Sequence, residues 1–189
     1  QDMRAARLFA YDKPLKIVDV DIPRLKHPTD VLVRITGAGV CHTDLHIVEG
    51  VWREKVQTSL PYTLGHENAG VIEQTGEDVT AFRKGEKVIL HPVITDGLCR
   101  ACRIGEDMHC ENLVFPGITA DGGFAEYLVT SQRSLVKLHD LKPEDAAPLA
   151  DRDRSGPSPS PVRGANHAAK RRGVLFPIHA ENARAVGQL

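Results

Sequence analysis

The chain has 189 residues, a net charge of −1 and a hydrophobic content of 41%, as expected for one ordinary domain or for one domain and part of a second. The near-neutral charge excludes a strongly basic nucleic-acid-binding protein and an acidic disordered protein. No apolar run approaches the roughly 20 residues that span a bilayer, and the N-terminus lacks the apolar segment of a signal peptide. We therefore expect a cytoplasmic protein without a membrane or nucleic-acid partner.

Short apolar segments predict a mainly β domain that extends from the N-terminus to residue 151. The predicted strands cover residues 15–18, 31–35, 68–74, 87–93 and 124–130. Clusters of Gly, Pro and Asp separate them at residues 27–30, 75–78, 84–86 and 121–123. Many short strands with frequent turn signals are typical of a β-sandwich or β-barrel.

Two segments carry helix signals. One extends from His42 to Glu49, and Gly50 is a suitable stop signal directly after it. The other begins near Pro143, where a proline and two acidic residues suit a first helical turn. We expect a helix at each position.

The composition changes abruptly after Asp151. Residues 151–189 contain seven basic and three acidic residues, a net charge of +4, so residues 1–150 carry −5. Residues 155–161 are rich in Pro and Ser and predict an extended linker, while residues 180–186 have only a weak helix pattern. We expect residues 152–189 to be an irregular or disordered tail, produced by a frameshift or truncation of the gene. A genuine divergent tail is the alternative.

Cys41, His66 and Glu67 form the first group of candidate metal ligands. Thiolate and imidazole are good zinc ligands, and a catalytic zinc usually takes three protein ligands and keeps one position for water or substrate. Cys41 follows a predicted strand and a turn at Gly37–Gly39, while Gly65 lets the backbone turn tightly beside a metal. The alternative interpretation is a reduced core cysteine with histidines at the surface.

A second group of candidate ligands lies in a loop at about residues 95–113. Three cysteines at this spacing predict a closed structural zinc site. His109 competes for the position of fourth ligand, but it directly precedes a cysteine, and adjacent residues rarely both reach one ion. A redox Cys-x-x-Cys motif, an iron–sulfur cluster or, in a secreted chain, disulfides are the alternatives. The expected ligands are Asp96, Cys99, Cys102 and Cys110.

Several motifs together resemble the zinc-dependent alcohol dehydrogenases of the medium-chain dehydrogenase/reductase superfamily. They are Gly39–Asp44, Gly65–Ile72, the cysteine lobe, Asp121–Tyr127 and Ala146–Asp151, and the match extends from about Met3 to Asp151. The resemblance implies a GroES-like (chaperonin-10-like) β-barrel that carries a catalytic zinc and a lobe with a structural zinc. It also implies reversible oxidation of a small alcohol to an aldehyde or ketone with NAD or NADP. The resemblance leaves the oligomeric state open between a monomer and a homo-oligomer, because the main dimer contact of the family usually comes from its Rossmann domain.

The resemblance assigns the catalytic zinc to four residues. Cys41 and His66 match zinc ligands, and Asp151 matches the third ligand, which is Cys in many members and Asp in a recognised subset. Glu67 matches a glutamate beside the metal that approaches the ion when water leaves. Asp96 stands where most members have a fourth structural cysteine.

The resemblance also assigns roles on the segment after Cys41. Asp44 matches a carboxylate that accepts a hydrogen bond from the zinc-bound imidazole, which fixes its tautomer. Thr43 matches the hydroxyl that takes the alcohol proton, and His46 matches the base that passes this proton to solvent. His42 stands where many members contact the cofactor phosphate.

Trp52 and Phe115 fall where the family builds its apolar substrate pocket, although ordinary packing explains each of them equally well.

The family continues past the position of Asp151 into a Rossmann domain. This sequence contains no strand–Gly-x-Gly-x-x-Gly–helix segment. Its lone Gly-x-Gly, at Gly37–Gly39, leads directly into Cys41 and is therefore not a dinucleotide-binding motif.

We therefore expect the metal and substrate half of an alcohol dehydrogenase without its Rossmann domain, inactive on its own. An enzyme completed by a separate nucleotide-binding chain and a non-enzymatic zinc-binding barrel are the alternatives.

Overall fold

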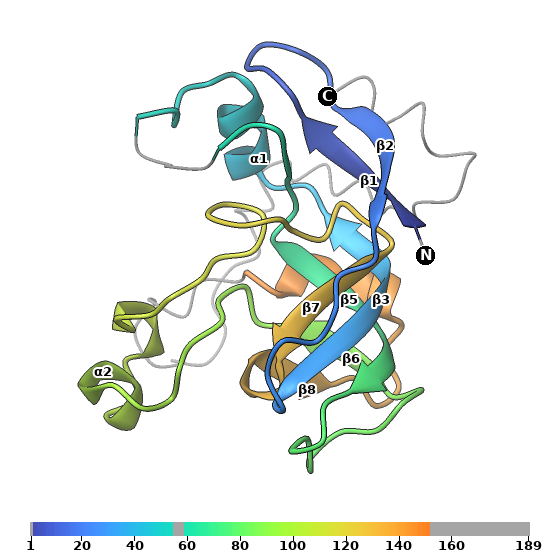
Figure 1. Ribbon diagram of the computed structural model, residues 1–189, viewed down its shortest axis with the longest axis vertical. Coiled ribbons are helices and arrows are strands. Elements are labelled where there is room, and N and C mark those ends of the chain that lie inside the picture. The colour runs from blue at the N-terminus through green and yellow to red at the C-terminus, as the bar shows by residue number, and fades with distance from the viewer. Residues whose placement is uncertain (1, 55–58, 152–189) are drawn as a thin grey trace, which may run out of the picture.

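A five-stranded antiparallel sheet forms the body of the protein in a computed structural model that describes residues 2–54 and 59–151 (Figure 1). Its strand order is β7-β3-β5-β6-β8. The longest strand, β3, pairs with both β5 and β7 and so lies inside the sheet. The strands are β3 (Asp30–Gly39), β5 (Glu67–Thr75), β6 (Lys87–Leu90), β7 (Tyr127–Ser131) and β8 (Leu135–Lys137).

A smaller sheet of three strands has the order β2-β1-β4. An isolated antiparallel bridge between Ala5 and Ala125 joins it to the segment before β7, and Arg4 pairs with Glu126 at 2.9 Å beside that bridge. The strands of this sheet are β1 (Asp2–Leu8), β2 (Lys16–Asp21) and β4 (Tyr62–Thr63). The prediction of a mainly β domain is therefore confirmed.

The structure confirms the five predicted strands with shifted ends. β6 ends at Leu90 instead of Val93, and β7 begins at Tyr127 instead of Phe124. Both shortened ends lie beside the candidate sites, where the chain leaves the regular ladder. The expected linker at residues 155–161 and the weak helix at residues 180–186 lie outside the described residues.

The prediction of a turn at Gly37–Gly39 is wrong, because these residues continue β3 to its end. They pair with Ala69, Asn68 and Glu67 of β5. Glycine inside a strand often marks a close approach of another group, and here a Cβ at Gly37 would come within 2.9 Å of the carbonyl oxygen of Pro143. The glycines are therefore explained by what packs on the strand and not by a reversal of the chain.

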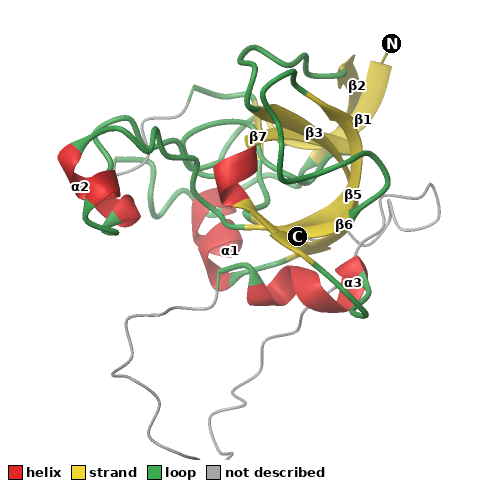
Figure 2. Cartoon of the chain, turned by 90° about the horizontal axis from the view of Figure 1, so that it is seen from below, coloured by secondary structure: helices red, strands yellow, loops and turns green. Residues whose placement is uncertain are grey.

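Both predicted helices are present. Helix α1 (His42–Val48) is followed by Gly50, whose φ of 74° suits only a glycine without strain. Helix α3 (Pro143–Ala146) starts on its proline and continues into the 3₁₀ helix η3 (Ala147–Leu149). Figure 2 shows α1 and α3 on the same side of the strands. Three short helices were not predicted. They are α2 (Arg100–Arg103) and the 3₁₀ helices η1 (Asp107–His109) and η2 (Gln132–Ser134).

The main core lies between the two sheets and α1. Alternate residues of β3, Val31, Val33 and Ile35, are all buried, as the twofold period of a strand requires for one face. Leu8, Leu64 and Ile72 complete its most buried part. This core fixes the end of β3 and the start of β5, which lead into the first candidate site.

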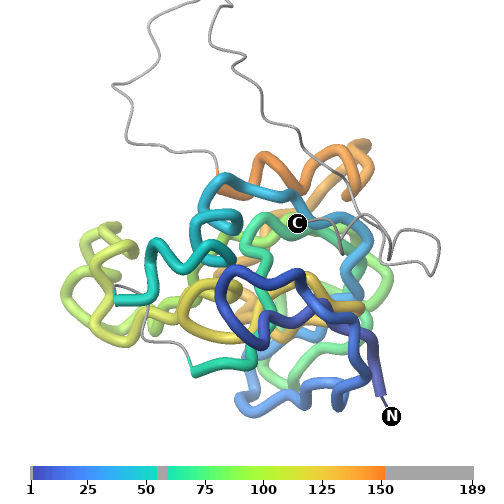
Figure 3. Tube along the Cα trace, turned by 90° about the horizontal axis from the view of Figure 1, so that it is seen from above, coloured from blue at the N-terminus to red at the C-terminus, as the bar shows by residue number. Residues whose placement is uncertain are grey.

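Residues 95–113 form a lobe that projects from the strands and contains α2 (Figures 1 and 3). The segment from α3 to Asp151, orange in Figure 3, runs beside the light-blue end of β3, and contacts of α3 and η3 with β3 agree with this view. Among the described residues, no helix combines the length and apolar character needed to cross a membrane.

Candidate metal centres

Four predicted ligands, from three segments far apart in the sequence, meet at one point. Cys41 is the N-cap of α1, His66 and Glu67 stand at the start of β5, and Asp151 follows η3. Their donor atoms all lie within 4.8 Å of one another. The four residues assigned to the catalytic zinc by resemblance are thus brought together.

Gly65 turns the chain so that His66 points inward. Its φ of 96° lies in the left-handed region, where a side chain is strained, and a Cβ there would come within 2.7 Å of the Phe124 backbone nitrogen. The amide of Asn68 donates to the Gly65 carbonyl at 3.0 Å and holds the turn. His66 is consequently 1% exposed.

Asp44 fixes the other side of the His66 ring. One carboxylate oxygen, Oδ2, accepts a hydrogen bond from the Cys41 backbone at 2.9 Å, and the other, Oδ1, lies 3.3 Å from His66 Nδ1. Asp44 therefore ties the start of α1 to the histidine, as the role of an orienting carboxylate requires.

His66 Nε2 points to the opposite side and lies 3.6 Å from Asp151 Oδ2. This buried nitrogen has no hydrogen-bond partner among the described residues, and a buried polar atom without a partner destabilises the fold. A zinc ion held by Cys41, His66 and Asp151 would satisfy it, and thiolate, imidazole and carboxylate are all zinc ligands. The residues present therefore fit the metal.

The electrostatics of the cluster favour the ionised thiol. The pKa of Cys41 is lowered, chiefly by its hydrogen bond with His66. Burial lowers the pKa of His66, but Asp44 and Cys41 outweigh this effect and raise the pKa to about 10. Without a metal the cluster thus holds a proton on His66, which a metal must displace because only the neutral imidazole binds it.

The three residues predicted to handle the proton and the cofactor lie on α1. Thr43 Oγ1 is 3.7 Å from Cys41 Sγ, so the hydroxyl lies at the edge of the cluster. His46 is half-buried and His42 is exposed, and their ring centroids are 4.4 Å apart. The helix therefore leads from the cluster to the surface through Thr43 and these histidines.

The two predicted pocket residues differ in their contacts. The ring of Phe115 stands perpendicular to that of His66, with centroids 5.9 Å apart. Phe115 and Trp52 are both half-buried and pack against the main core. The contact with His66 supports the assignment of Phe115 to a pocket beside the metal, whereas for Trp52 core packing alone accounts for its position.

The second predicted cluster forms in the lobe. The donor atoms of its four predicted ligands lie within 4.8 Å of one another, and this group does not include His109, which is exposed. The geometry therefore favours Asp96 over His109 as the fourth ligand. All four cysteines of the chain are free of disulfides, which removes that alternative. The cluster consists of Asp96, Cys99, Cys102 and Cys110.

Hydrogen bonds prepare the lobe for a metal. The backbone N–H of Asp96 donates to Cys110 Sγ at 3.4 Å. The backbone N–H of Cys102 donates to Cys99 Sγ at 3.5 Å, and this bond lowers the pKa of Cys99. Asp96 accepts from the Cys99 backbone at 3.0 Å and from the Asn112 amide at 2.8 Å, and these bonds hold its pKa well below the usual range. Burial, by contrast, raises the pKa of Cys102 to about 12, so a metal must also displace a proton here.

An ion pair attaches the lobe to the barrel. Arg133, from η2, donates to Asp107 Oδ1 at 2.8 Å, and Thr95 donates to the same oxygen at 3.0 Å. Together with Asn112, these residues support the predicted site but were not identified from the sequence. No local signal could have found them, because Arg133 and Asp107 are 26 positions apart.

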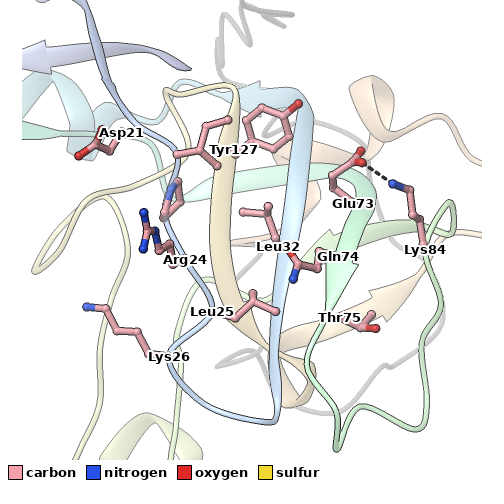
Figure 4. A pocket seen from close by; sticks show the side chains of 12 residues that line it. Asp21, Arg24, Leu25, Lys26, Leu32, Glu73, Gln74, Thr75, Lys84 and Tyr127 are labelled. Carbon is pink, nitrogen blue, oxygen red and sulfur yellow. Dashed lines mark hydrogen bonds and ion pairs between the residues drawn. The ribbon is translucent and has the colours of Figure 1, made fainter. Parts of the chain in front are cut away.

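An open groove lies elsewhere, beside the end of β2, the following loop and β3, β5 and β7 (Figure 4). Leu32 and Tyr127 line it together with the ion pair of Glu73 and Lys84. None of its lining residues belongs to either cluster. Its charges are mixed, because Arg24, Lys26 and Lys84 line it together with Asp21 and Glu73, so it gives no argument for binding an anionic cofactor.

Solved structures of known enzymes match this fold. The alcohol dehydrogenase of the hyperthermophilic archaeon Aeropyrum pernix is 62% identical with a TM-score of 0.74, over 78% of this chain and 44% of that chain. The cobalt- and zinc-bound thermostable alcohol dehydrogenase of Pyrobaculum aerophilum is 34% identical with a TM-score of 0.68, over 79% and 45%. The NADP-dependent D-arabinose 1-dehydrogenase of Saccharolobus solfataricus is 48% identical over 149 residues, which are 78% of this chain and 42% of that protein.

The chain therefore spans less than half the length of these relatives. The family model described as the alcohol dehydrogenase GroES-like domain matches residues 27–140, which include the whole five-stranded sheet, the lobe and every predicted ligand except Asp151. The predicted GroES-like fold is confirmed. By its sequence and its fold, this chain belongs to the family of alcohol dehydrogenase GroES-like domains.

Proposed function

We propose that the chain is the zinc- and substrate-binding half of an NAD- or NADP-dependent alcohol dehydrogenase. The observation that carries the proposal is the meeting of Cys41, His66, Glu67 and Asp151 around the Nε2 of His66, which has no hydrogen-bond partner within the described part of the chain. A scaffold protein has no need of a buried histidine held between two carboxylates. The geometry therefore supports the enzyme over a non-enzymatic barrel.

Zinc bound here would act as a Lewis acid that lowers the pKa of a bound alcohol. Cys41, His66 and Asp151 would hold the ion, and Asp44 would keep the proton of the imidazole on Nδ1. Thr43 would accept the alcohol proton and His46 would pass it to solvent. Phe115 would exclude water on the side of the pocket that it covers.

Hydride transfer requires a nicotinamide cofactor, which the protein must orient against the alcohol. We propose that His42 contacts the phosphate of NAD or NADP, because it is the exposed histidine of α1. We propose residues 1–151 as one domain, since α3 and η3, which lead to the last predicted ligand, pack against β3 and β5.

Zinc analysis tests the proposed function directly. The purified chain should bind two zinc ions when zinc is supplied. Cys99→Ala should remove the lobe ion and His66→Ala should remove the other, because each variant deletes a ligand of one cluster only. Two ions retained in His66→Ala, or none bound by the unmodified chain, would refute the assignment.

Asp44 provides a test of the surroundings of the metal. Asp44→Asn keeps the volume of the side chain but removes the negative charge 3.3 Å from His66 Nδ1. We expect the zinc affinity of the Cys41 cluster to fall roughly 10- to 100-fold, the range found for residues that orient metal ligands. Chelator competition measures this change. The lobe zinc serves as the internal control, and an equal loss at both sites would indicate general unfolding instead.

The free cysteines and predicted zinc ligands support a proposed location in a reducing compartment such as the cytoplasm. We also propose that the chain forms a homo-oligomer through the lobe, where three large hydrophobic side chains are exposed. Exposed apolar surface of this kind often marks a protein interface. These side chains are Leu98 (70% exposed), Ile104 (58%) and Met108 (57%).

Sedimentation velocity tests the proposed oligomer. The chain should sediment as more than a monomer, and the double substitution Leu98→Ser with Ile104→Ser should shift it to the monomer without releasing zinc. The matched control, Val136→Ser, changes an exposed hydrophobic residue of β8 outside the lobe and should have no effect. A monomeric unmodified chain would contradict the proposal.

A further inference from the structure

Gly39 and Glu67 face each other across the ladder between β3 and β5. Gly39 is not among the glycines with positive φ, so its backbone conformation is open to any residue. The space beside it is not, because a Cβ at this position would overlap Glu67 Oε2 and would stand 3.0 Å from Glu67 Cβ. The glycine therefore makes room for the carboxylate of Glu67.

This carboxylate belongs to the first metal cluster. A Glu67 oxygen lies within 4.8 Å of the donor atoms of Cys41, His66 and Asp151, and Glu67 is only 3% exposed. Three protein ligands are enough for a zinc that keeps one exchangeable position, whereas a fourth protein ligand closes the site. The place where this carboxylate rests consequently decides whether the site is open.

We propose that Gly39 is a positioning residue that gives the Glu67 carboxylate a resting place against β3, and so keeps one position of the metal available to an added ligand. The inference rests on the proposed zinc site. With alanine at position 39, the new methyl group takes the space of Oε2. The buried carboxylate must then turn away from β3, and attraction to the cation directs it to the metal.

The spectrum of the cobalt-loaded chain tests this inference without any measurement of activity. Thiocyanate should bind to the cobalt at the Cys41 cluster and change its visible spectrum, whereas the lobe offers four protein ligands and no free position. Gly39→Ala should weaken thiocyanate binding at least tenfold. The double variant Gly39→Ala with Glu67→Gln should restore it, because glutamine fills the same space but is a poorer ligand than a carboxylate.

The double variant Gly39→Ala with Glu67→Gln separates two possible causes of weaker thiocyanate binding, ligation of the metal by residue 67 and steric strain at position 39. The crowding at position 39 persists in this variant, but the carboxylate that could bind the metal is absent. Unchanged thiocyanate affinity in Gly39→Ala, or no recovery in the double variant, would overturn the inference alone. A chain that binds cobalt only in the lobe would overturn the proposed function together with the inference. If Gly39→Ala does not fold, Gly39→Ala with Glu67→Ala should fold because the overlapping side chain is removed, and continued failure would also overturn the inference.

Discussion

Fused to the part of the Aeropyrum pernix alcohol dehydrogenase that this chain does not cover, residues 1–151 should oxidise alcohols with NAD or NADP, whereas the unfused chain should show no turnover above background. The described residues supply the proposed metal cluster, the proposed proton path and the proposed pocket residue Phe115, but they do not position a nicotinamide ring. Correct positioning of two reactants is worth roughly 7–11 kcal/mol of an activation barrier. The fusion should restore this contribution.

Two substitutions show whether activity in the fusion uses the proposed site. His66→Ala should lower kcat/KM by roughly 10³-fold or more, because Lewis-acid stabilisation is worth several kcal/mol. Thr43→Val keeps the shape of the side chain but deletes the hydroxyl, and it should cost about 10²- to 10⁴-fold, as loss of a positioned proton acceptor does. Thr43→Ser is the matched control and should retain most of the activity. An unchanged kcat/KM in both His66→Ala and Thr43→Val, or turnover by the unfused chain, would contradict the assignment.

Zinc binding at the Cys41 cluster should weaken steeply as the pH falls. The pKa of His66 is raised to about 10 in the metal-free cluster, and a zinc-bound imidazole is neutral. Zinc must therefore displace this proton at every pH below about 10. Each displaced proton makes the apparent dissociation constant rise about tenfold for each pH unit of acidification.

Chelator competition between pH 6 and 9 in the Cys99→Ala variant measures this dependence at the Cys41 cluster alone. Asp44→Ala should make the dependence shallower, because the carboxylate that raises the pKa of His66 is gone. The matched control is His139→Gln, which changes an exposed histidine outside both clusters. A zinc affinity independent of pH would show that His66 is not a ligand.

The candidate ligands of the lobe could be proposed from the sequence because their spacing and chemistry are local properties. The cysteines of the lobe, for example, lie within twelve positions of one another. The resemblance to zinc-dependent alcohol dehydrogenases assigned Cys41, His66 and Asp151 to one predicted zinc site. Their spacing in the sequence alone does not indicate that they belong together. The structure added that a buried and otherwise unpartnered nitrogen of His66 faces Asp151.

Other features depend on contacts that the sequence pattern does not contain. Glycine was interpreted as a turn signal at Gly37–Gly39, but these residues lie in a strand whose neighbours fill the space that side chains would need. Helix α2 has only four residues, too few for a periodic pattern. The support of the lobe by Arg133 depends on folding, because it brings η2 beside Asp107.

The central claim is that Cys41, His66 and Asp151 hold a zinc ion. Anomalous diffraction at the zinc absorption edge from crystals of the zinc-loaded chain tests it most directly. We predict two peaks, one in the lobe and one at about 2.0–2.3 Å from Cys41 Sγ, His66 Nε2 and an Asp151 oxygen. A peak in the lobe with none between Cys41 and His66 at full zinc loading would contradict the claim.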